Sequence, residues 1–244
     1  LIITGCDSKA LNSPYSSQDN EISTLYSSFS LRPKHLDRAR SYSSNEANFT
    51  GQIYEPPFQY HYLKRPYTLI PLTATELPTV RYFSDDHMEL TEEDNENVAY
   101  SVYEINIKPG IYYQPHPAFV QDDGQYLYHQ LNKSELDEVR TLSDFKQQET
   151  RELIAEDYVY QIKRLADPET HSPILGLMSE YIVGLSDFAT KLRNDRSKLD
   201  LRAIEIEGVS TIDRYTYQIK VYGKYPQLRY WLAMPFFAPM PWEA

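Results

Sequence analysis

The stretch LIAEDYVYQIKRLADP, residues 153–168, decides the fold of this chain. Its apolar side chains recur at the spacing of one helix face, and they are Tyr158, Val159, Ile162, Leu165 and Ala166. Acidic residues open the stretch and basic residues lie near its far end, which complements the helix dipole. The helix has to stop before Pro168, because the residue preceding a proline avoids the helical conformation. The stretch therefore predicts an amphipathic helix that covers a core.

The neighbouring stretches predict what this helix packs against. Residues 98–108 alternate between apolar and polar side chains, which indicates a half-buried strand, and Pro109-Gly110 ends it in a turn. Residues 209–222 read as a hairpin that turns at Asp213-Arg214. A second helical stretch covers residues 174–192 and is weakened by Gly176 and Gly184, and a short helix covers residues 226–233. Strands and helices alternate along the chain, so the predicted class is α/β, or mixed α+β.

Bulk composition excludes some classes of function. The 244 residues carry a formal net charge of -11, which argues against nucleic-acid binding because phosphate recognition usually needs a basic surface. Hydrophobic residues make up 41% of the chain, enough for a core. The 22 tyrosines suit either half-buried strands or a surface that buries varied ligands. No apolar stretch reaches the roughly 20 residues of a spanning helix.

The first residues, Leu1-Ile2-Ile3-Thr4-Gly5-Cys6-Asp7, resemble the end of a bacterial lipoprotein signal. A short apolar run leads into small residues and then into Cys6, whose thiol would receive the lipid. We expect residues 1–5 to be a signal remnant and residues 6–30 to be a lipid anchor with a flexible tether, because this segment is rich in Ser, Asn and Asp and lacks periodicity. Asp7 resembles the inner-membrane retention signal of Gram-negative lipoproteins.

No catalytic constellation stands out in the sequence. Glycine patterns for phosphate or dinucleotide binding are absent, as is a G-x-S-x-G elbow, and the lone Cys6 lies in the tether. The six histidines are scattered, without the pairwise spacing of metal ligands. The sequence therefore predicts a protein that is not an enzyme, with no catalytic residue, no metal site and no cofactor.

The order of several short motifs resembles the family-5 extracellular solute-binding proteins, the oligopeptide and dipeptide type of ABC importers. The resemblance extends over about residues 31–244 and rests on five segments. They are a strand-and-turn region from Leu36-Asp37 to Asn45, Ile53-Tyr54-Glu55, YEINIKPG at residues 103–110, the helix of residues 153–168 with Ser172-Pro173, and the hairpin start at residues 209–216.

The resemblance implies a type II periplasmic-binding fold, here incomplete, with the first lobe and its extra domain. Residues 31–61 would begin the first lobe, residues 62–235 would form the extra domain, and residues 236–244 would return to the first lobe and stop there.

The resemblance also implies a ligand site. Family members grip ligand at the turn after the first strand, which maps here to Tyr42, Ser43, Ser44 and Asn45. They also contact ligand at the residue after Ser-Pro, which is Ile174 here where tyrosine is usual. A second departure from the family pattern is Pro56-Pro57 in place of Gly-Leu.

The function implied is capture of oligopeptides and their delivery to the permease subunits of an ABC transporter. The expected location is the periplasmic face of the cell membrane, with a lipid anchor at Cys6 and a monomeric state. One alternative is a binding protein of the same family for a metal chelate or another small solute. An alternative of another class is a lipid-anchored hydrolase, which would need a nucleophile or a carboxylate pair in a cleft.

Overall fold

A computed structural model describes residues 27–91, 97–195 and 200–244. The chain divides into two compact units, Leu1–Arg32 and Pro33–Ala244. Every helix and strand of the described residues lies in the second unit. The expected signal remnant, Cys6 and most of the expected tether fall on residues 1–26, outside the described residues.

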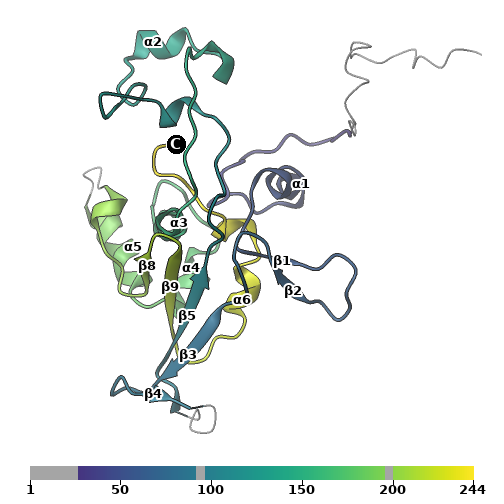
Figure 1. Ribbon diagram of the computed structural model, residues 1–244, viewed down its shortest axis with the longest axis vertical. Coiled ribbons are helices and arrows are strands. Elements are labelled where there is room, and N and C mark those ends of the chain that lie inside the picture. Colours follow the sequence, from purple (N-terminus) through teal and green to yellow (C-terminus); the bar gives the residue numbers. More distant parts are fainter. Residues whose placement is uncertain (1–26, 92–96, 196–199) are drawn as a thin grey trace, which may run out of the picture. The chain divides into compact units, whose positions relative to one another are not determined.

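Within the described residues, the centre of the second unit is a five-stranded antiparallel sheet in the order β4-β3-β5-β9-β8 (Figure 1). The strands are β3 (Thr79–Phe83), β4 (Glu89–Leu90), β5 (Tyr100–Asn106), β8 (Val209–Asp213) and β9 (Thr216–Tyr222). Tyr103 of β5 pairs with Val80 of β3 on one side and with Ile219 of β9 on the other. The predicted strand at residues 98–108 and the predicted hairpin at residues 209–222 are thereby confirmed.

Helix α3 (Ala155–Leu165) packs against β8 and β9 (Figure 1). The five residues predicted to share its apolar face are all buried in the main hydrophobic core. The Tyr158 ring stacks on the Tyr217 ring of β9, with the centroids 5.0 Å apart. The Tyr158 hydroxyl lies 2.6 Å from Oγ1 of Thr73, so its polar end is satisfied inside the core.

The second predicted helical stretch is two helices. Helix α4 (Leu175–Tyr181) and helix α5 (Leu185–Asn194) are separated at Gly184, whose φ of +76° is a left-handed conformation that glycine adopts without strain. Gly176, the other predicted weak point, lies inside α4. The short helix expected at residues 226–233 is α6 (Leu228–Trp231).

Gly208 lies where three chain segments meet. Its N–H donates to the Val183 carbonyl at 2.9 Å, and its carbonyl accepts from the Lys220 N–H at 2.8 Å. The Val183 N–H in turn donates to the Lys220 carbonyl at 3.0 Å. An added Cβ at Gly208 would lie 2.3 Å from the Val183 carbonyl oxygen, so only glycine allows this approach.

The segment before β5 differs from the expectation of a first strand at residues 36–37. A turn at residues 38–40 leads instead into helix α1 (Ser44–Ile53), followed by the hairpin of β1 (Phe58–Tyr60) and β2 (Leu69–Pro71). The strand expectation was wrong because Asp37 and Glu46 use their carboxylates to bind the backbone of this segment, which favours a turn and a capped helix over an extended strand.

Residues 117–149 contain short elements, of which only the first, at residues 117–119, is buried. These are η3 (Pro117–Phe119), β6 (Gln121–Asp122), β7 (Gln125–Tyr126), α2 (Lys133–Asp137) and η4 (Leu142–Asp144). Asn132 caps α2, and the Glu135 carboxylate accepts a hydrogen bond from the Asn132 N–H. Two further short turns are η5 (Leu201–Ala203) and η6 (Pro235–Phe237).

The C-terminal residues are tied to the start of α3 by an ion network. Arg151 donates to both oxygens of Asp157 at 2.8 and 2.6 Å, and to both oxygens of Glu243 at 2.6 Å each. The side chain of Arg151 is 23% exposed, whereas those of Asp157 and Glu243 are 2% and 3% exposed. The Met240 N–H adds a bond to the Asp157 carbonyl at 3.1 Å. Two buried carboxylates therefore share one arginine.

The predicted class, α/β with mixed α+β character, is confirmed. The main core runs through the chain from Ala39 and Phe58 to Phe237. The boundaries expected at residues 61/62 and 235/236 stay a prediction.

Candidate functional site

The predicted ligand turn, residues 42–45, is organised by the buried carboxylate of Glu46. Among the described residues, five groups donate to it: the N–H groups of Lys34 and His35 to Oε1 at 3.0 Å each, and the Ser41 hydroxyl, Tyr42 N–H and Ser43 N–H to Oε2 at 3.0, 3.2 and 3.4 Å. Ser43 is the N-cap of α1 and Glu46 its third helical residue, so the pair forms a capping box. The turn is therefore fixed by its own chain.

Hydrogen bonds set the protonation of Glu46. Burial alone would raise the pKa of this carboxyl, but the bonds from Ser43, His35 and Ser41 outweigh it and hold the pKa at about 2. Glu46 is consequently ionised at neutral pH, where an ionised carboxylate binds N–H donors most strongly.

Asp37 fixes the preceding turn, residues 38–40, to α3. Its carboxylate accepts two bonds from the Arg164 guanidinium, at 3.1 and 2.6 Å, and a third from the Ala39 N–H at 3.0 Å. Burial raises the pKa of Asp37, but the Arg164 bonds and charge reverse that effect, so the pKa lies below its ordinary value. The helix that decides the fold thus also positions the turn.

Arg38 lies beneath the turn and is almost wholly buried. Its guanidinium donates to the Pro239 carbonyl and lies over the Tyr54 ring, with Cζ 4.3 Å from the centroid. Its Nε finds no hydrogen-bond acceptor among the described residues. Burial lowers the pKa of Arg38 to about 10, since a buried cation is poorly solvated.

The four predicted ligand residues 42–45 differ in exposure and in their place relative to α1. Tyr42 is exposed, and its ring lies 5.8 Å from the ring of the buried Phe236. Ser43 caps the helix, and Ser44 and Asn45 are its first two residues, not part of a free loop. Ser44 therefore lies where helix N–H groups have no partner within the helix and can meet a ligand carbonyl.

Ile174, the fifth predicted ligand residue, is placed in the main core at the start of α4, where its side chain is buried. Its carbonyl accepts from the Met178 N–H at 2.9 Å. The structure thus gathers residues 42–45 at the start of α1 and gives Ile174 a packing role; ligand contact at all five positions stays a prediction.

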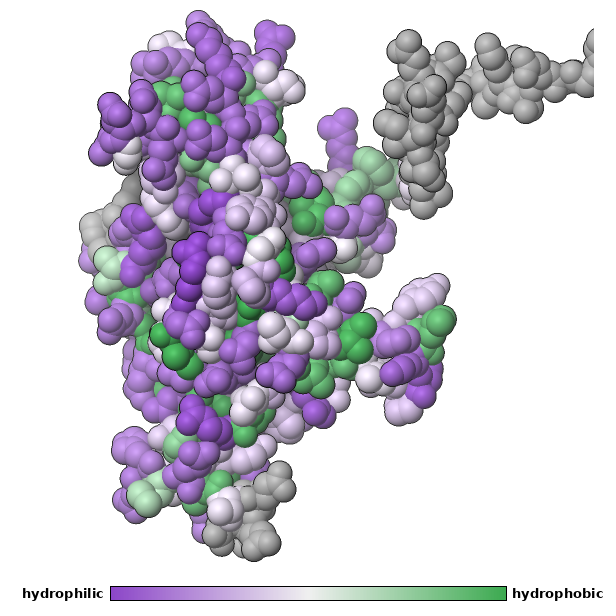
Figure 2. Space-filling view, in the orientation of Figure 1, coloured by the Kyte–Doolittle hydropathy of each residue, from purple (hydrophilic) through white to green (hydrophobic). Residues whose placement is uncertain are grey.

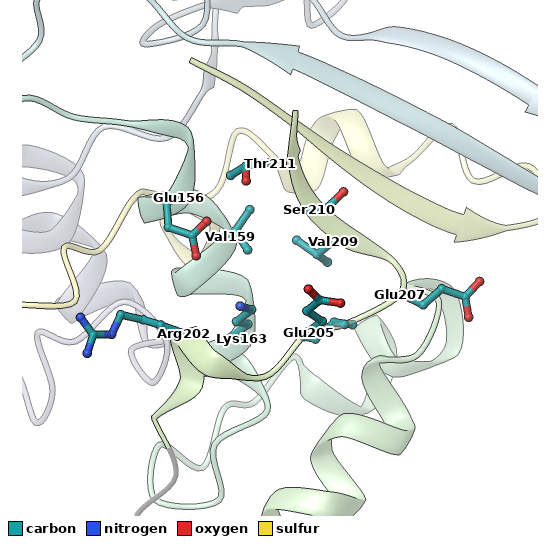
Figure 3. A pocket seen from close by; sticks show the side chains of 10 residues that line it. Glu156, Val159, Lys163, Arg202, Glu205, Glu207, Val209, Ser210 and Thr211 are labelled. Carbon is teal, nitrogen blue, oxygen red and sulfur yellow. The ribbon is translucent and has the colours of Figure 1, made fainter. Parts of the chain in front are cut away.

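A depression of about 640 Å³ lies between α3, η5 and β8, and none of the five predicted residues lines it (Figure 3). Its wall includes Glu156 and Lys163 of α3, Arg202 of η5, and Ser210 and Thr211 of β8. Burial raises the pKa of Glu156, and the nearby Lys163 charge partly opposes that shift. The lining can meet polar groups of either sign.

Among the described residues, no group of three or more His, Cys, Asp or Glu residues is arranged to hold a metal ion. Within the same residues, no helix combines the length and apolarity needed to cross a bilayer.

Glu46 is the site residue that sequence reasoning missed. The signal was present, because Ser43 and Glu46 have the S-x-x-E spacing of a capping box. The bonds from Lys34 and His35 carried no such signal, since they come from residues 12 and 11 positions earlier.

Replacing Glu46 with glutamine is expected to lower the free energy of unfolding by about 2–3 kcal/mol at pH 7. The folded pKa of about 2 lies below the ordinary 4.5, so the stabilisation is present above about pH 4.5 and is lost as the pH falls toward 2. Urea unfolding of both proteins between pH 7 and pH 3 measures this difference. Glu135→Gln is the matched control, since Glu135 caps α2 at an exposed site and should matter by less than about 1 kcal/mol. A Glu46→Gln effect that stays constant with pH would contradict the assignment.

Neither a protein-family model nor a curated protein sequence matches the chain. Solved structures do. A periplasmic oligopeptide-binding protein of an oligopeptide ABC transporter, OppAIV from Borrelia burgdorferi, is similar at 15% identity and a TM-score of 0.50, covering 86% of this chain and 29% of that one. Listeria monocytogenes OppA bound to peptide is 16% identical with a TM-score of 0.49 and coverage of 84% and 28%. The Escherichia coli murein tripeptide binding protein MppA is 16% identical with a TM-score of 0.49 and coverage of 86% and 29%.

These similarities concern the fold. The mixed α/β arrangement of this chain is that of part of a periplasmic binding protein. The chain spans less than a third of the length of the solved structures that it matches.

Proposed function

We propose that the chain belongs to an extracytoplasmic solute-binding protein that captures oligopeptides and delivers them to an ABC transporter, without catalysis of its own. The observation that carries the proposal is the turn at residues 42–45, held by Glu46 and Asp37 with exposed Tyr42 and the start of α1 on its surface. The solved proteins of similar fold support it, since they are described as oligopeptide and murein tripeptide binding proteins.

In this proposal the ligand backbone pairs with the turn in the manner of strand addition. Main-chain hydrogen bonds then supply affinity for any sequence, and side-chain pockets supply preference. A second lobe has to close over the turn, so the 244-residue chain alone should bind peptides only weakly; nanomolar binding by it would contradict this. The proposed anchor at Cys6 would hold the protein at the periplasmic face of the membrane.

The peptide proposal is tested first by identifying the ligands that co-purify with the protein. The intact gene product is purified from its own cells without denaturation, and released ligands are identified by mass spectrometry. Oligopeptides are the expected result. Recovery of sugars or metal chelates alone would show that the peptide proposal is wrong.

Replacing Ser44 with proline tests the turn itself. Proline at the first helical position keeps the helix but removes the N–H that would meet the ligand. The preceding Ser43 already has the extended conformation that proline requires, with φ -83° and ψ 151°. Loss of one such bond should weaken peptide binding by the intact protein about tenfold, with the free energy of unfolding unchanged.

Lys133→Pro is the matched control, because Lys133 is the first residue of α2 and follows the similarly extended Asn132. Calorimetric titration with one co-purified peptide compares the three proteins. Equal affinities for Ser44→Pro and the control would place the ligand elsewhere.

A further inference from the structure

The hairpin tip, defined here as residues 61–68 between β1 and β2, exposes large apolar side chains. Tyr62 is 87% exposed, Leu63 76% and Tyr67 67%. Single exposed apolar residues are ordinary on a protein surface, but three within six positions of one turn form a patch. In Figure 2 the projecting hairpin carries hydrophobic and hydrophilic residues side by side. Such a patch indicates contact with another surface.

The same tip is cationic in an acidic chain. Lys64 and Arg65 are exposed, and residues 56–75 contain no Asp or Glu although the whole chain has a net charge of -11. Arg229, which is also exposed, lies beside the base of the hairpin, since it covers the ring of Tyr230 and Tyr230 stacks on Tyr60. The local charge therefore favours an anionic partner, while most of the remaining surface would repel one.

The tip is held in shape by its own bonds. The His61 N–H donates to the Thr68 carbonyl at 2.8 Å, and Nδ1 of His61 accepts from the N–H groups of Leu63 and Lys64 at 3.2 Å each. The Arg65 guanidinium lies over the Tyr67 ring, with Cζ 4.5 Å from the centroid. A preformed turn loses little conformational entropy on binding.

We propose that the hairpin tip docks on an anionic phospholipid surface. Lys64 and Arg65 would meet lipid phosphates, Tyr62 and Tyr67 would lie at the level of the headgroups, and Leu63 would enter the acyl boundary. Tyrosine rings, an aliphatic side chain and basic residues are the combination that favours the interface between membrane and water. Charge complementarity selects an anionic surface, and a lipid surface offers both phosphates for Lys64 and Arg65 and an acyl boundary for Leu63. This inference is independent of peptide binding.

The test measures association of the unacylated 244-residue chain with vesicles. One set is phosphatidylcholine alone, and the other contains about 30% phosphatidylglycerol. We expect binding only to the anionic vesicles, and loss of that binding when the salt is raised from about 20 mM to about 500 mM. Lys64→Glu with Arg65→Glu should lower the partition coefficient at least about 30-fold.

A second double variant, Lys133→Glu with Lys146→Glu, makes the same change in net charge at exposed sites of the segment at residues 118–149. It should lower the partition coefficient by less than about threefold. Insertion of the tip is measured separately. Leu63→Cys is made in a Cys6→Ser background, and the new thiol is labelled with a polarity-sensitive dye. The emission of the dye should shift to the blue on anionic vesicles only. Absence of binding by the parent chain, equal losses in both double variants, or an unshifted dye would each overturn the proposal.

Discussion

Alanine in place of Gly208 is expected to lower the free energy of unfolding by about 3 kcal/mol, at the upper end of the usual cost of overpacking. The added methyl would lie 2.3 Å from the Val183 carbonyl oxygen, 2.8 Å from the Val183 nitrogen and 3.0 Å from the Lys220 carbonyl oxygen. All three are backbone atoms already held by hydrogen bonds, so they cannot rotate away as a flexible side chain would. Urea unfolding at neutral pH measures the change.

Gly51→Ala is the matched control and should have the opposite sign. Gly51 lies in α1, and an added Cβ there meets nothing within 4 Å. Alanine in an exposed helix should raise the free energy of unfolding by about 0.5–1 kcal/mol. Similar effects at both glycines would show that the close approach at Gly208 is absent in solution.

Removal of Arg151 is the second substitution with a large expected effect. Arg151→Ala leaves the buried carboxylates of Asp157 and Glu243 without their shared cation, and breaking such a network by removing one partner costs about 3–5 kcal/mol. Burial already raises the pKa of Asp157 despite the bonds from Arg151. Without the arginine the Asp157 carboxyl should take up a proton more readily, so the loss of stability should shrink as the pH falls.

Arg81→Ala provides the comparison. Arg81 pairs with Glu104 at 3.8 Å, with side chains 40% and 30% exposed, and such pairs contribute less than about 1 kcal/mol. Thermal and urea unfolding of both variants between pH 7 and pH 4 measure the difference. An Arg151→Ala effect as small as that of Arg81→Ala would contradict the ion network.

Local patterns predicted the elements that bury one clear face. The helix at residues 153–168 repeats its apolar residues over three turns. Strands β5 and β9 alternate buried and more exposed positions over residues 103–106 and 217–222, so each element could be predicted without knowledge of its partner. Strand β3 and the hairpin of β1 and β2 were not anticipated. They are short, and β3 shows no buried position that would mark an alternating face.

For the candidate site, the sequence predicted the position in the chain but not the contacts that shape it. Family resemblance pointed to residues 42–45, but the groups that shape this turn come from elsewhere: Arg164 lies 127 positions from Asp37, and Lys34 lies 12 positions from Glu46. Ile174 shows the opposite limit, since a position after Ser-Pro does not reveal that its side chain is packed in the core. Tertiary contacts of this kind leave no periodic trace in a sequence.

The bond from Arg38 to Pro239 has a consequence for synthesis. Its partners are 201 positions apart. A ribosome adds about 5–20 residues per second, so Arg38 is synthesised some 10–40 s before its acceptor Pro239. Arg151 is likewise synthesised before its acceptor Glu243, which lies 92 positions later in the chain. The buried contacts of Arg38 and the full ion network of Arg151 can therefore form only after residue 243 has been synthesised, so this unit cannot reach its complete fold before that point.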